Sequence, residues 1–206
     1  MDRTAHWEKV YNTKAATDVS WYQPQLEKSL FLISSIGIVD GGQIIDVGGG
    51  ASTLVDDSLR RGFKHVTVLD ISSVAIENAK VRLGPLADQV TWLCTDITTS
   101  ELTSKHYDIW HDRAAFHFLT SGEDRRRYIQ TMRYALKPNG HLIVAAFAHD
   151  GPAKCSGLDV IRYSPDQLKN EFGDEFHLVQ SLSEDHITPS GGIQRFVYCC
   201  FRRQMD

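Results

Sequence analysis

The chain has 206 residues, of which 42% are hydrophobic and 23% are charged. This size and composition predict one globular domain over residues 1–206 with a single filled core. The formal net charge of -4 gives no overall attraction to nucleic acid or to an anionic membrane. We see no apolar leader segment at the N-terminus and no run near the ~20 apolar residues of a membrane span, so we expect a cytoplasmic protein.

Two helical segments predict an N-terminal cap over residues 1–38. The first includes residues 7–11, and the second runs from Pro24 to Ile38 with apolar residues at helical spacing. Trp21 and Tyr22 lie between them. These two aromatic side chains are expected either to pack in the core or to fold as a lid over a ligand.

Seven short runs rich in β-branched residues predict seven strands in the core, residues 39–206. Helical patterns separate most of the runs; Ser72 and Gly84 bracket one of them, and Ser121 begins another. This alternation predicts an α/β fold whose mostly parallel sheet is covered by helices on both faces. The expected strands are Gln43–Val47, His65–Leu69, Gln89–Leu93, Tyr107–Trp110, His141–Ala145, His177–Leu182 and Arg195–Phe201.

The last two expected strands are joined differently from the others. Residues 183–194 between them include Pro189 and Gly191–Gly192 and leave no room for a helix. We therefore expect an antiparallel hairpin at the edge of the sheet.

The four cysteines show no spacing typical of a metal site. Cys94, Cys199 and Cys200 lie in apolar runs, where we expect buried thiols. Cys155 lies in a loop rich in Gly and Ser and is the one we expect to be exposed. The sequence therefore predicts no metal site; a soft-metal site formed by Cys155, His111 and His186 is a remote alternative.

The most informative segment is the run from Gln43 to Ser52, an apolar strand that ends in a carboxylate and three glycines. Glycines at a strand end let a ligand approach the backbone closely. A dinucleotide-binding pattern would need a third spaced glycine at Thr53, and Asp46 would repel a pyrophosphate. The same carboxylate suits an ammonium or sulfonium group.

Acidic residues also end the next two strands, at Asp70 and within Thr95-Asp96-Ile97. Two further segments, residues 107–119 and residues 135–142, follow in the expected order. With the glycine run and the terminal hairpin, these segments make the chain from about residue 39 to residue 201 resemble the class I S-adenosylmethionine-dependent methyltransferases. The resemblance implies a Rossmann-like fold with S-adenosyl-L-methionine as the cofactor.

The resemblance also implies contacts for single residues. Asp70 would accept hydrogen bonds from the ribose hydroxyls, and Asp96 would accept one from the adenine amino group. Ile71 would pack on the adenine ring, and the Ile97 amide would donate to it. The full set of implied cofactor contacts is Asp46, Gly48, Gly49, Gly50, Asp70, Ile71, Asp96, Ile97, His111 and Trp21. The alternative for each Asp is a turn or helix-capping role.

His111 and His117 lie at and just after the end of the fourth strand, the edge where ligands bind in such sheets. Their ordinary pKa lies near neutrality, so they are the predicted general bases if the acceptor must lose a proton. His117 could instead pack under the site. Asp112 and Arg113, between them, are expected to form a structural ion pair; their turn is similar to that of thiopurine S-methyltransferase-like members of the superfamily.

The sequence therefore predicts methyl transfer to a small-molecule acceptor by direct displacement. The alternatives are a protein methyltransferase acting on lysine or another side chain, a nicotinamide-dependent oxidoreductase, and a non-catalytic protein that binds S-adenosylmethionine. No nucleic-acid or membrane partner is expected, and the chain is expected to be a monomer or a homodimer.

Overall fold

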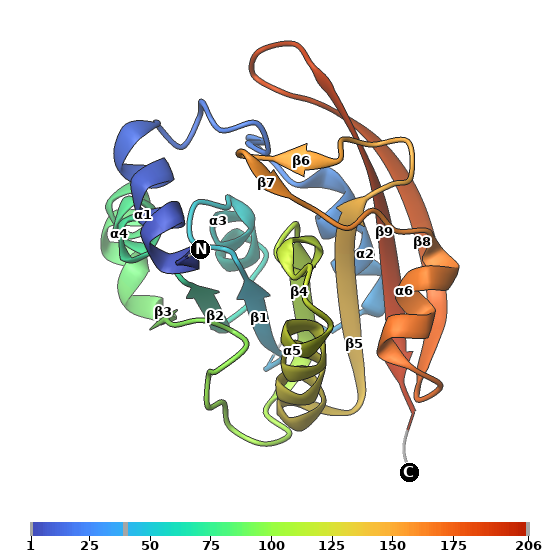
Figure 1. Ribbon diagram of the computed structural model, residues 1–206. Coiled ribbons are helices and arrows are strands. Elements are labelled where there is room, and N and C mark those ends of the chain that lie inside the picture. Colours follow the sequence, from blue (N-terminus) through green and yellow to red (C-terminus); the bar gives the residue numbers. More distant parts are fainter. Residues whose placement is uncertain (1, 39–40, 205–206) are drawn as a thin grey trace.

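Seven strands form one twisted sheet in the computed structural model, which describes residues 2–38 and 41–204 (Figure 1). Their order is β3-β2-β1-β4-β5-β9-β8, and β9 is the strand that runs antiparallel to its neighbours. The chain order reverses between β1 and β4, so a ligand crevice is expected where these two strands end. The strands are β1 (Gln43–Val47), β2 (His65–Asp70), β3 (Val90–Cys94), β4 (Tyr107–Arg113), β5 (Leu136–Phe147), β8 (Phe176–Ile187) and β9 (Ile193–Arg203).

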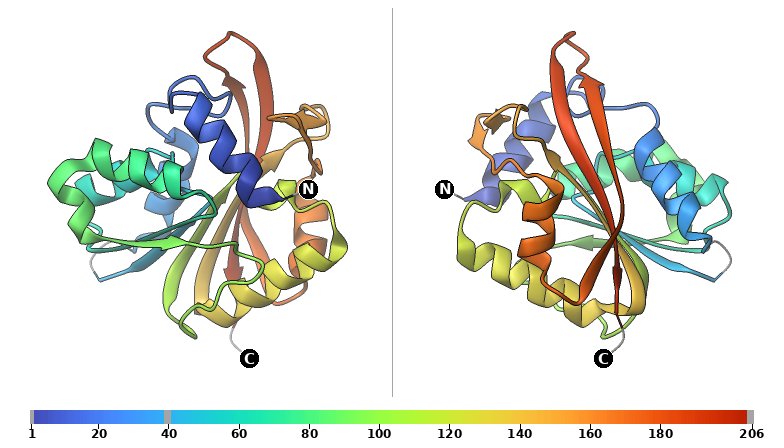
Figure 2. Two further views of the ribbon diagram at one scale, coloured as in Figure 1. Left: turned by 60° about the vertical axis from the view of Figure 1, so that its left-hand side comes forward. Right: turned by 90° about the vertical axis from the view of Figure 1, so that its right-hand side faces the viewer.

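Helices cover both faces of the sheet, as the alternating pattern predicts. Figure 2 shows α5 (Gly122–Ala135) and α6 (Pro165–Phe172) on one face, and α2 (Glu27–Ile36), α3 (Leu54–Arg60) and α4 (Ser73–Leu83) on the other. Each helical layer packs its apolar side chains on the buried strands to form a separate half of the core. No helix in the described ranges is long and apolar enough to cross a membrane.

The remaining helix, α1 (Arg3–Thr13), lies across the carboxyl ends of the strands beside α4 (Figures 1 and 2). Asp2 caps it by accepting a hydrogen bond from the Ala5 amide. The predicted seven-stranded α/β architecture with a helical N-terminal segment is thus confirmed. The predicted border between cap and core falls at residues 39–40, which lie outside the described residues.

The C-terminal half of the sheet is longer than predicted. β5 begins at Leu136, directly after α5, and passes through Asn139 with a positive φ of 60°. The β8–β9 hairpin extends to Ile187 and Ile193, so its tip stands out beyond the sheet (Figure 2). A small second hairpin, β6 (Lys154–Cys155) with β7 (Leu158–Asp159), was not predicted from the sequence.

Two cysteines lie where the sequence did not predict them. Cys94 is exposed, because β3 is an edge strand and Cys94 is its last residue. Cys155 is buried, because β6 folds inward and places it near the hydroxyl of Ser20. Cys199 and Cys200 are buried in β9, as predicted.

Candidate functional site

Two adjoining cavities lie at the carboxyl ends of β1, β2 and β4. The first, of about 110 Å³, is lined by the ends of these strands, by the loop after β3 and by aromatic side chains of α1. The second lies beside the turn after β1. Four residues line both cavities: Tyr11, Trp21, Gly48 and Arg113. The strand ends that the sequence predicted as the ligand site therefore surround these two cavities, which we call together the hollow.

The turn after β1 is narrow because it holds glycines. Gly48 has a positive φ of 70°, and a Cβ atom there would lie 2.8 Å from the Cβ of Ala115. A Cβ atom at Gly50 would lie 2.9 Å from the carboxylate of Asp70. Gly48 lines both cavities, whereas Gly49 and Gly50 belong to the same turn but line neither cavity. A larger side chain would close the space between this turn and its neighbours.

Asp70 ends β2 and faces the first cavity. Its Oδ1 accepts a hydrogen bond from the Ser72 amide at 2.8 Å, and its Oδ2 accepts one from the Gly50 amide at 2.9 Å. Burial raises the pKa of Asp70 from its ordinary value of 3.8 to about 6, against the opposing effect of these two amides. Each oxygen keeps a lone pair for a ligand hydroxyl, so the carboxylate can bind a vicinal diol.

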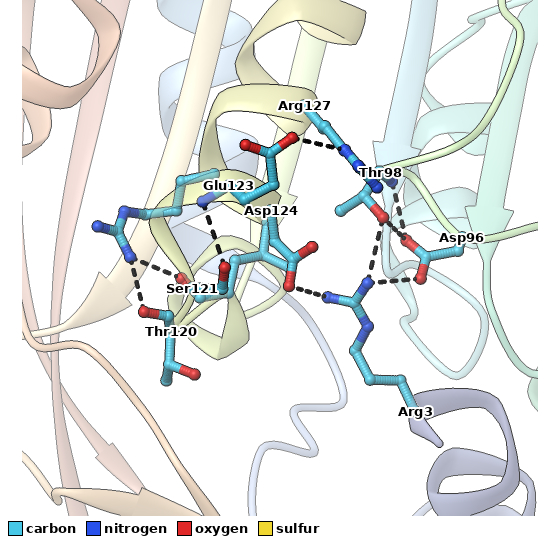
Figure 3. A network of polar contacts seen from close by, with 10 residues as sticks. Arg3, Asp96, Thr98, Thr120, Ser121, Glu123, Asp124 and Arg127 are labelled. Carbon is cyan, nitrogen blue, oxygen red and sulfur yellow. Dashed lines mark hydrogen bonds and ion pairs between the residues drawn. The ribbon is translucent and has the colours of Figure 1, made fainter. Parts of the chain in front are cut away.

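Asp96, after β3, lies in a polar network with the N-terminus of α1 (Figure 3). Arg3 donates to Asp96 at 2.9 Å and to Thr98 at 3.1 Å through one nitrogen, and to Asp124 of α5 at 3.1 Å through the other. Arg3, Asp96 and the predicted contacts Ile71 and Ile97 all line the first cavity. Sequence reasoning missed Arg3, because its partners lie about a hundred residues away.

A second contact fixes the other side of α1. The carboxylate of Glu8 accepts hydrogen bonds from the Ser73 amide at 2.7 Å and from the Ser72 hydroxyl at 3.1 Å, at the N-terminus of α4. Burial alone would raise the pKa of Glu8, but these hydrogen bonds outweigh it and lower the pKa. Trp7 and Tyr11 flank Glu8 and line the first cavity, so α1 covers the hollow with aromatic rings.

Arg3→Ala is expected to loosen α1. The substitution removes both ion pairs of Arg3, which are partly exposed, so we expect a cost of about 1 kcal/mol and an opening of α1 that is roughly 5-fold more frequent. Amide hydrogen exchange of residues 3–13 measures this opening. Arg127→Ala is the matched control, because among the described residues Arg127 pairs with Glu123, four positions earlier in α5, and with no residue of α1 (Figure 3). Equal exchange in both variants would contradict a fastening role for Arg3.

Asp46 ends up in a buried chain of hydrogen bonds. His111 Nδ1 donates to Oδ1 of Asp46 at 2.7 Å, and its Nε2 shares a hydrogen bond with the Ser29 hydroxyl of α2 at 2.8 Å. Asp46 lines the second cavity, but His111 lines neither. His111 therefore reaches the hollow only through Asp46, which it orients.

His117 lies in the turn after β4 and is completely buried. Its Nδ1 accepts a hydrogen bond from the Phe147 amide at 3.3 Å, and its ring packs on that of Phe147. Burial lowers the pKa of His117 to about 3, so the ring is neutral at physiological pH. It lines neither cavity. The catalytic role predicted for His111 and His117 is thus without geometric support.

Arg113 lines both cavities, contrary to the structural role that the sequence suggested. Its Nε donates to the Tyr198 hydroxyl and its Nη1 to the Trp21 carbonyl, each at 2.8 Å. The expected ion pair with Asp112 is not formed, because Asp112 accepts hydrogen bonds from Tyr128 and from the turn amides instead. Arg113 thereby holds Trp21 over the hollow, at the position that the sequence assigned to a lid.

The alternative metal site also finds no support. Nε2 of His186 bonds to the Ser20 carbonyl at 2.7 Å, whereas His111 is occupied by Asp46 and Ser29. Within residues 2–38 and 41–204, no group of three or more His, Cys, Asp or Glu side chains could hold a metal ion.

Comparisons with known proteins find similar sequences and a similar fold. A family model described as "Methyltransferase domain" matches residues 44–140. EEF1A lysine methyltransferase 2 of Danio rerio is 23% identical over 98% of this chain and 86% of its own length. Ubiquinone biosynthesis O-methyltransferase of Alkalilimnicola ehrlichii is 28% identical over 68% of this chain and 60% of its own length. The solved structure of N-methyltransferase NodS from Bradyrhizobium japonicum in complex with S-adenosyl-L-homocysteine has the same fold, with a TM-score of 0.71, 19% identity and coverage of 99% of this chain and 100% of that one.

Proposed function

The chain belongs to the class I S-adenosylmethionine-dependent methyltransferases, and from this we propose that it transfers the methyl group to a small-molecule acceptor. One observation favours a small-molecule acceptor: Trp7 and Tyr11 of α1, together with Trp21, cover the hollow. A concave cavity with Trp7, Tyr11, Trp21 and Phe118 in its wall suits a small molecule better than an extended polymer.

The residues present fit the cofactor. Asp70 offers two carboxylate oxygens for the ribose hydroxyls, and Asp96 lines the same cavity beside Ile71 and Ile97, where the adenine would lie. Asp46 lines the second cavity and has an oxygen, Oδ2, with no hydrogen-bond partner in the described part of the chain. That oxygen can accept a hydrogen bond from the ammonium group of the methionine end.

When bound, the cofactor supplies a methyl group on an already activated sulfonium. The protein then has to align the acceptor and exclude water. Trp21 and Phe118 lie edge-to-face against Trp7 on the cavity wall, with ring centroids 5.6 Å and 5.0 Å, respectively, from that of Trp7. Such alignment alone can supply about 7–11 kcal/mol of the barrier. We therefore assign no general base, and we propose a positioning role for His111 through Asp46.

Formation of S-adenosylhomocysteine in the presence of single acceptors tests this function. We expect turnover with one class among thiols, amines, carboxylates and selenium or tellurium oxyanions, and none without acceptor. Asp46→Asn should reduce turnover with every acceptor, since it changes the cofactor site and not the acceptor. Cofactor binding without turnover on any acceptor would favour a non-catalytic protein.

A protein substrate is the second candidate, favoured by the similarity to EEF1A lysine methyltransferase 2 along nearly the whole chain. Incubation with a cell lysate and cofactor carrying a labelled methyl group separates the two. Label in the small-molecule fraction supports our proposal, whereas label confined to a protein band contradicts it.

A further inference from the structure

The tip of the β8–β9 hairpin holds the segment that carries Trp21. Residues 14–26 connect α1 to α2 as turns and bends and lie against this hairpin (Figures 1 and 2). Nε2 of His186 donates to the Ser20 carbonyl at 2.7 Å, and the Gln194 amide donates to the Ser20 hydroxyl at 3.1 Å. His186 and Gln194 are a cross-strand pair, so one position of the hairpin makes both contacts. The backbone next to Trp21 is therefore held from the hairpin.

His186 uses both of its ring nitrogens on this segment. The side chain is buried, and because a carbonyl oxygen can only accept, Nε2 carries the proton that bonds to Ser20. Burial lowers the pKa of His186 below its ordinary value of 6.5, so the ring is neutral and Nδ1 accepts from the Gln23 amide at 3.1 Å. The same amide also donates to Glu184 at 3.1 Å. The two nitrogens of the ring thus bind residues on either side of Trp21.

Arg113 holds the same segment from the end of β4. Its Nη1 donates to the Trp21 carbonyl at 2.8 Å. Its Nε donates to the Tyr198 hydroxyl, which in turn donates to Glu184 of the hairpin at 2.8 Å. The consecutive carbonyls of Ser20 and Trp21 are thus held from two directions. Trp21 lines both cavities, so the position of its indole in the hollow depends on these contacts.

We propose that His186 is a positioning residue that acts through the Ser20 carbonyl to hold the Trp21 indole against the methyl acceptor. The inference rests on the proposed transfer to a small-molecule acceptor. A displaced indole would leave the acceptor poorly aligned with the methyl group and lower kcat/KM. The His186 ring also packs edge-to-face on Phe196, with centroids 6.1 Å apart, so a merely structural role would depend on the ring and not on Nε2.

Two amide substitutions separate the two ring nitrogens. The amide nitrogen of His186→Gln comes close to the position of Nε2 and can donate to the Ser20 carbonyl, whereas the side-chain oxygen of His186→Asn replaces only Nδ1. The probe is the acceptor that gives the highest rate of S-adenosylhomocysteine formation. With it, we expect His186→Asn to lower kcat/KM about 10-fold and His186→Gln to stay within about 3-fold of the wild type.

Binding of S-adenosylhomocysteine separates the acceptor from the cofactor. Calorimetry should place both variants within about 3-fold of the wild type, because the cofactor contacts proposed for Asp70 and Asp96 do not involve the hairpin. A loss of affinity in His186→Asn that matches its loss of kcat/KM would assign Trp21 to the cofactor and overturn the inference. Circular dichroism and thermal melts establish that the variants are folded.

Amide hydrogen exchange of residues 19–23 reports on the segment without an acceptor. We expect exchange there to be about 5-fold faster in His186→Asn and less than about 2-fold faster in His186→Gln. His177→Asn is the matched control, because His177 is exposed at the other end of β8, in register with Arg202. This control should change neither exchange nor kcat/KM.

The pattern across the two His186 variants decides the inference. Equal losses of kcat/KM in His186→Asn and His186→Gln would overturn it, since the ring and not Nε2 would then be responsible. Wild-type kcat/KM in His186→Asn would overturn it as well, whatever the exchange rates. A wild-type protein that turns over no acceptor would contradict the proposed function itself, and the positioning role would fall with it.

Discussion

Asp70→Asn is expected to weaken cofactor binding about 100-fold or more. The Asp70 carboxylate already accepts hydrogen bonds from the Ser72 and Gly50 amides, and its remaining lone pairs point to the first cavity, where we place the ribose. An Asn at this position keeps the shape but offers only one accepting oxygen. A hydrogen bond to a charged group is worth about 1.5–3 kcal/mol, so two weakened bonds account for the expected loss.

The same substitution is expected to flatten the pH dependence of binding. Because burial raises the pKa of Asp70 to about 6, the carboxylate of the wild type is protonated below that pH and accepts fewer hydrogen bonds. Cofactor affinity should therefore rise with pH through about 6 and level off above it. Calorimetry of both proteins from pH 5 to pH 8 measures this effect. A variant that kept the wild-type profile would exclude Asp70 as its source.

The contribution of Asp70 to the stability of the cofactor-free protein should fall as the pH rises, whereas cofactor affinity rises. The pKa of Asp70 is raised above its ordinary value of 3.8 in the folded state, so folding favours the protonated form. Its contribution to the free energy of unfolding is therefore fully present below pH 4 and is lost as the pH rises through about 6. Asp112, whose pKa burial also raises to about 6, contributes in the same way to both proteins. The difference between wild type and variant thus isolates Asp70.

The residues at the strand ends were predictable because local pattern is enough to find them. An apolar run that stops at an Asp marks the carboxyl end of a strand, and parallel strands bring such ends together; Asp46, Asp70 and Asp96 needed no further information. The face on which a side chain lies is harder to derive. His111 lies in a strand that is buried on both faces, so no polar alternation distinguishes the cavity from the α2 layer where Ser29 binds it.

Long-range partners set the rest of the site and leave no local signal. Arg113 looked like a partner of its neighbour Asp112, but its contacts come from Trp21 and from Tyr198 of β9. Arg3 likewise meets Asp96 and Asp124 only because α1 folds back over the sheet. The side chains that cover the cavity are therefore positioned by long-range contacts, whereas the strand ends at its base can be predicted from the local sequence pattern.

Asp112→Ala is expected to lower the free energy of unfolding by about 3–5 kcal/mol. Asp112 is completely buried and accepts hydrogen bonds from the Tyr128 hydroxyl at 2.8 Å, the Ala115 amide at 2.9 Å and the Phe116 amide at 3.1 Å. The two amide bonds hold a turn in which Ala114 has a positive φ of 71°, a conformation that is unfavourable for alanine. Removing the carboxylate leaves these donors buried without partners. Urea denaturation measures the loss.

Tyr128→Phe provides the comparison, since it removes one of the three donors and leaves the turn amides bound. Tyr128→Phe should lower the free energy of unfolding by about 1–2 kcal/mol more than a surface substitution does, because the Trp110 indole loses its hydrogen-bond acceptor. A loss below about 1 kcal/mol in Asp112→Ala would show that the turn is held by other contacts.

The stability of this turn and the binding of the cofactor should be coupled. Ala114 and Ala115 line the first cavity, and Ala115 is the residue that a side chain at Gly48 would strike. Asp112→Asn keeps the volume of the side chain but turns one acceptor into a donor facing the Tyr128 hydroxyl, so it should shift the turn without emptying the core. We expect this variant to remain folded and to bind S-adenosylhomocysteine about 10-fold more weakly, because the walls on either side of Gly48 are built from this turn and from β1. Unchanged affinity in a destabilised variant would mean that the turn supports the core alone.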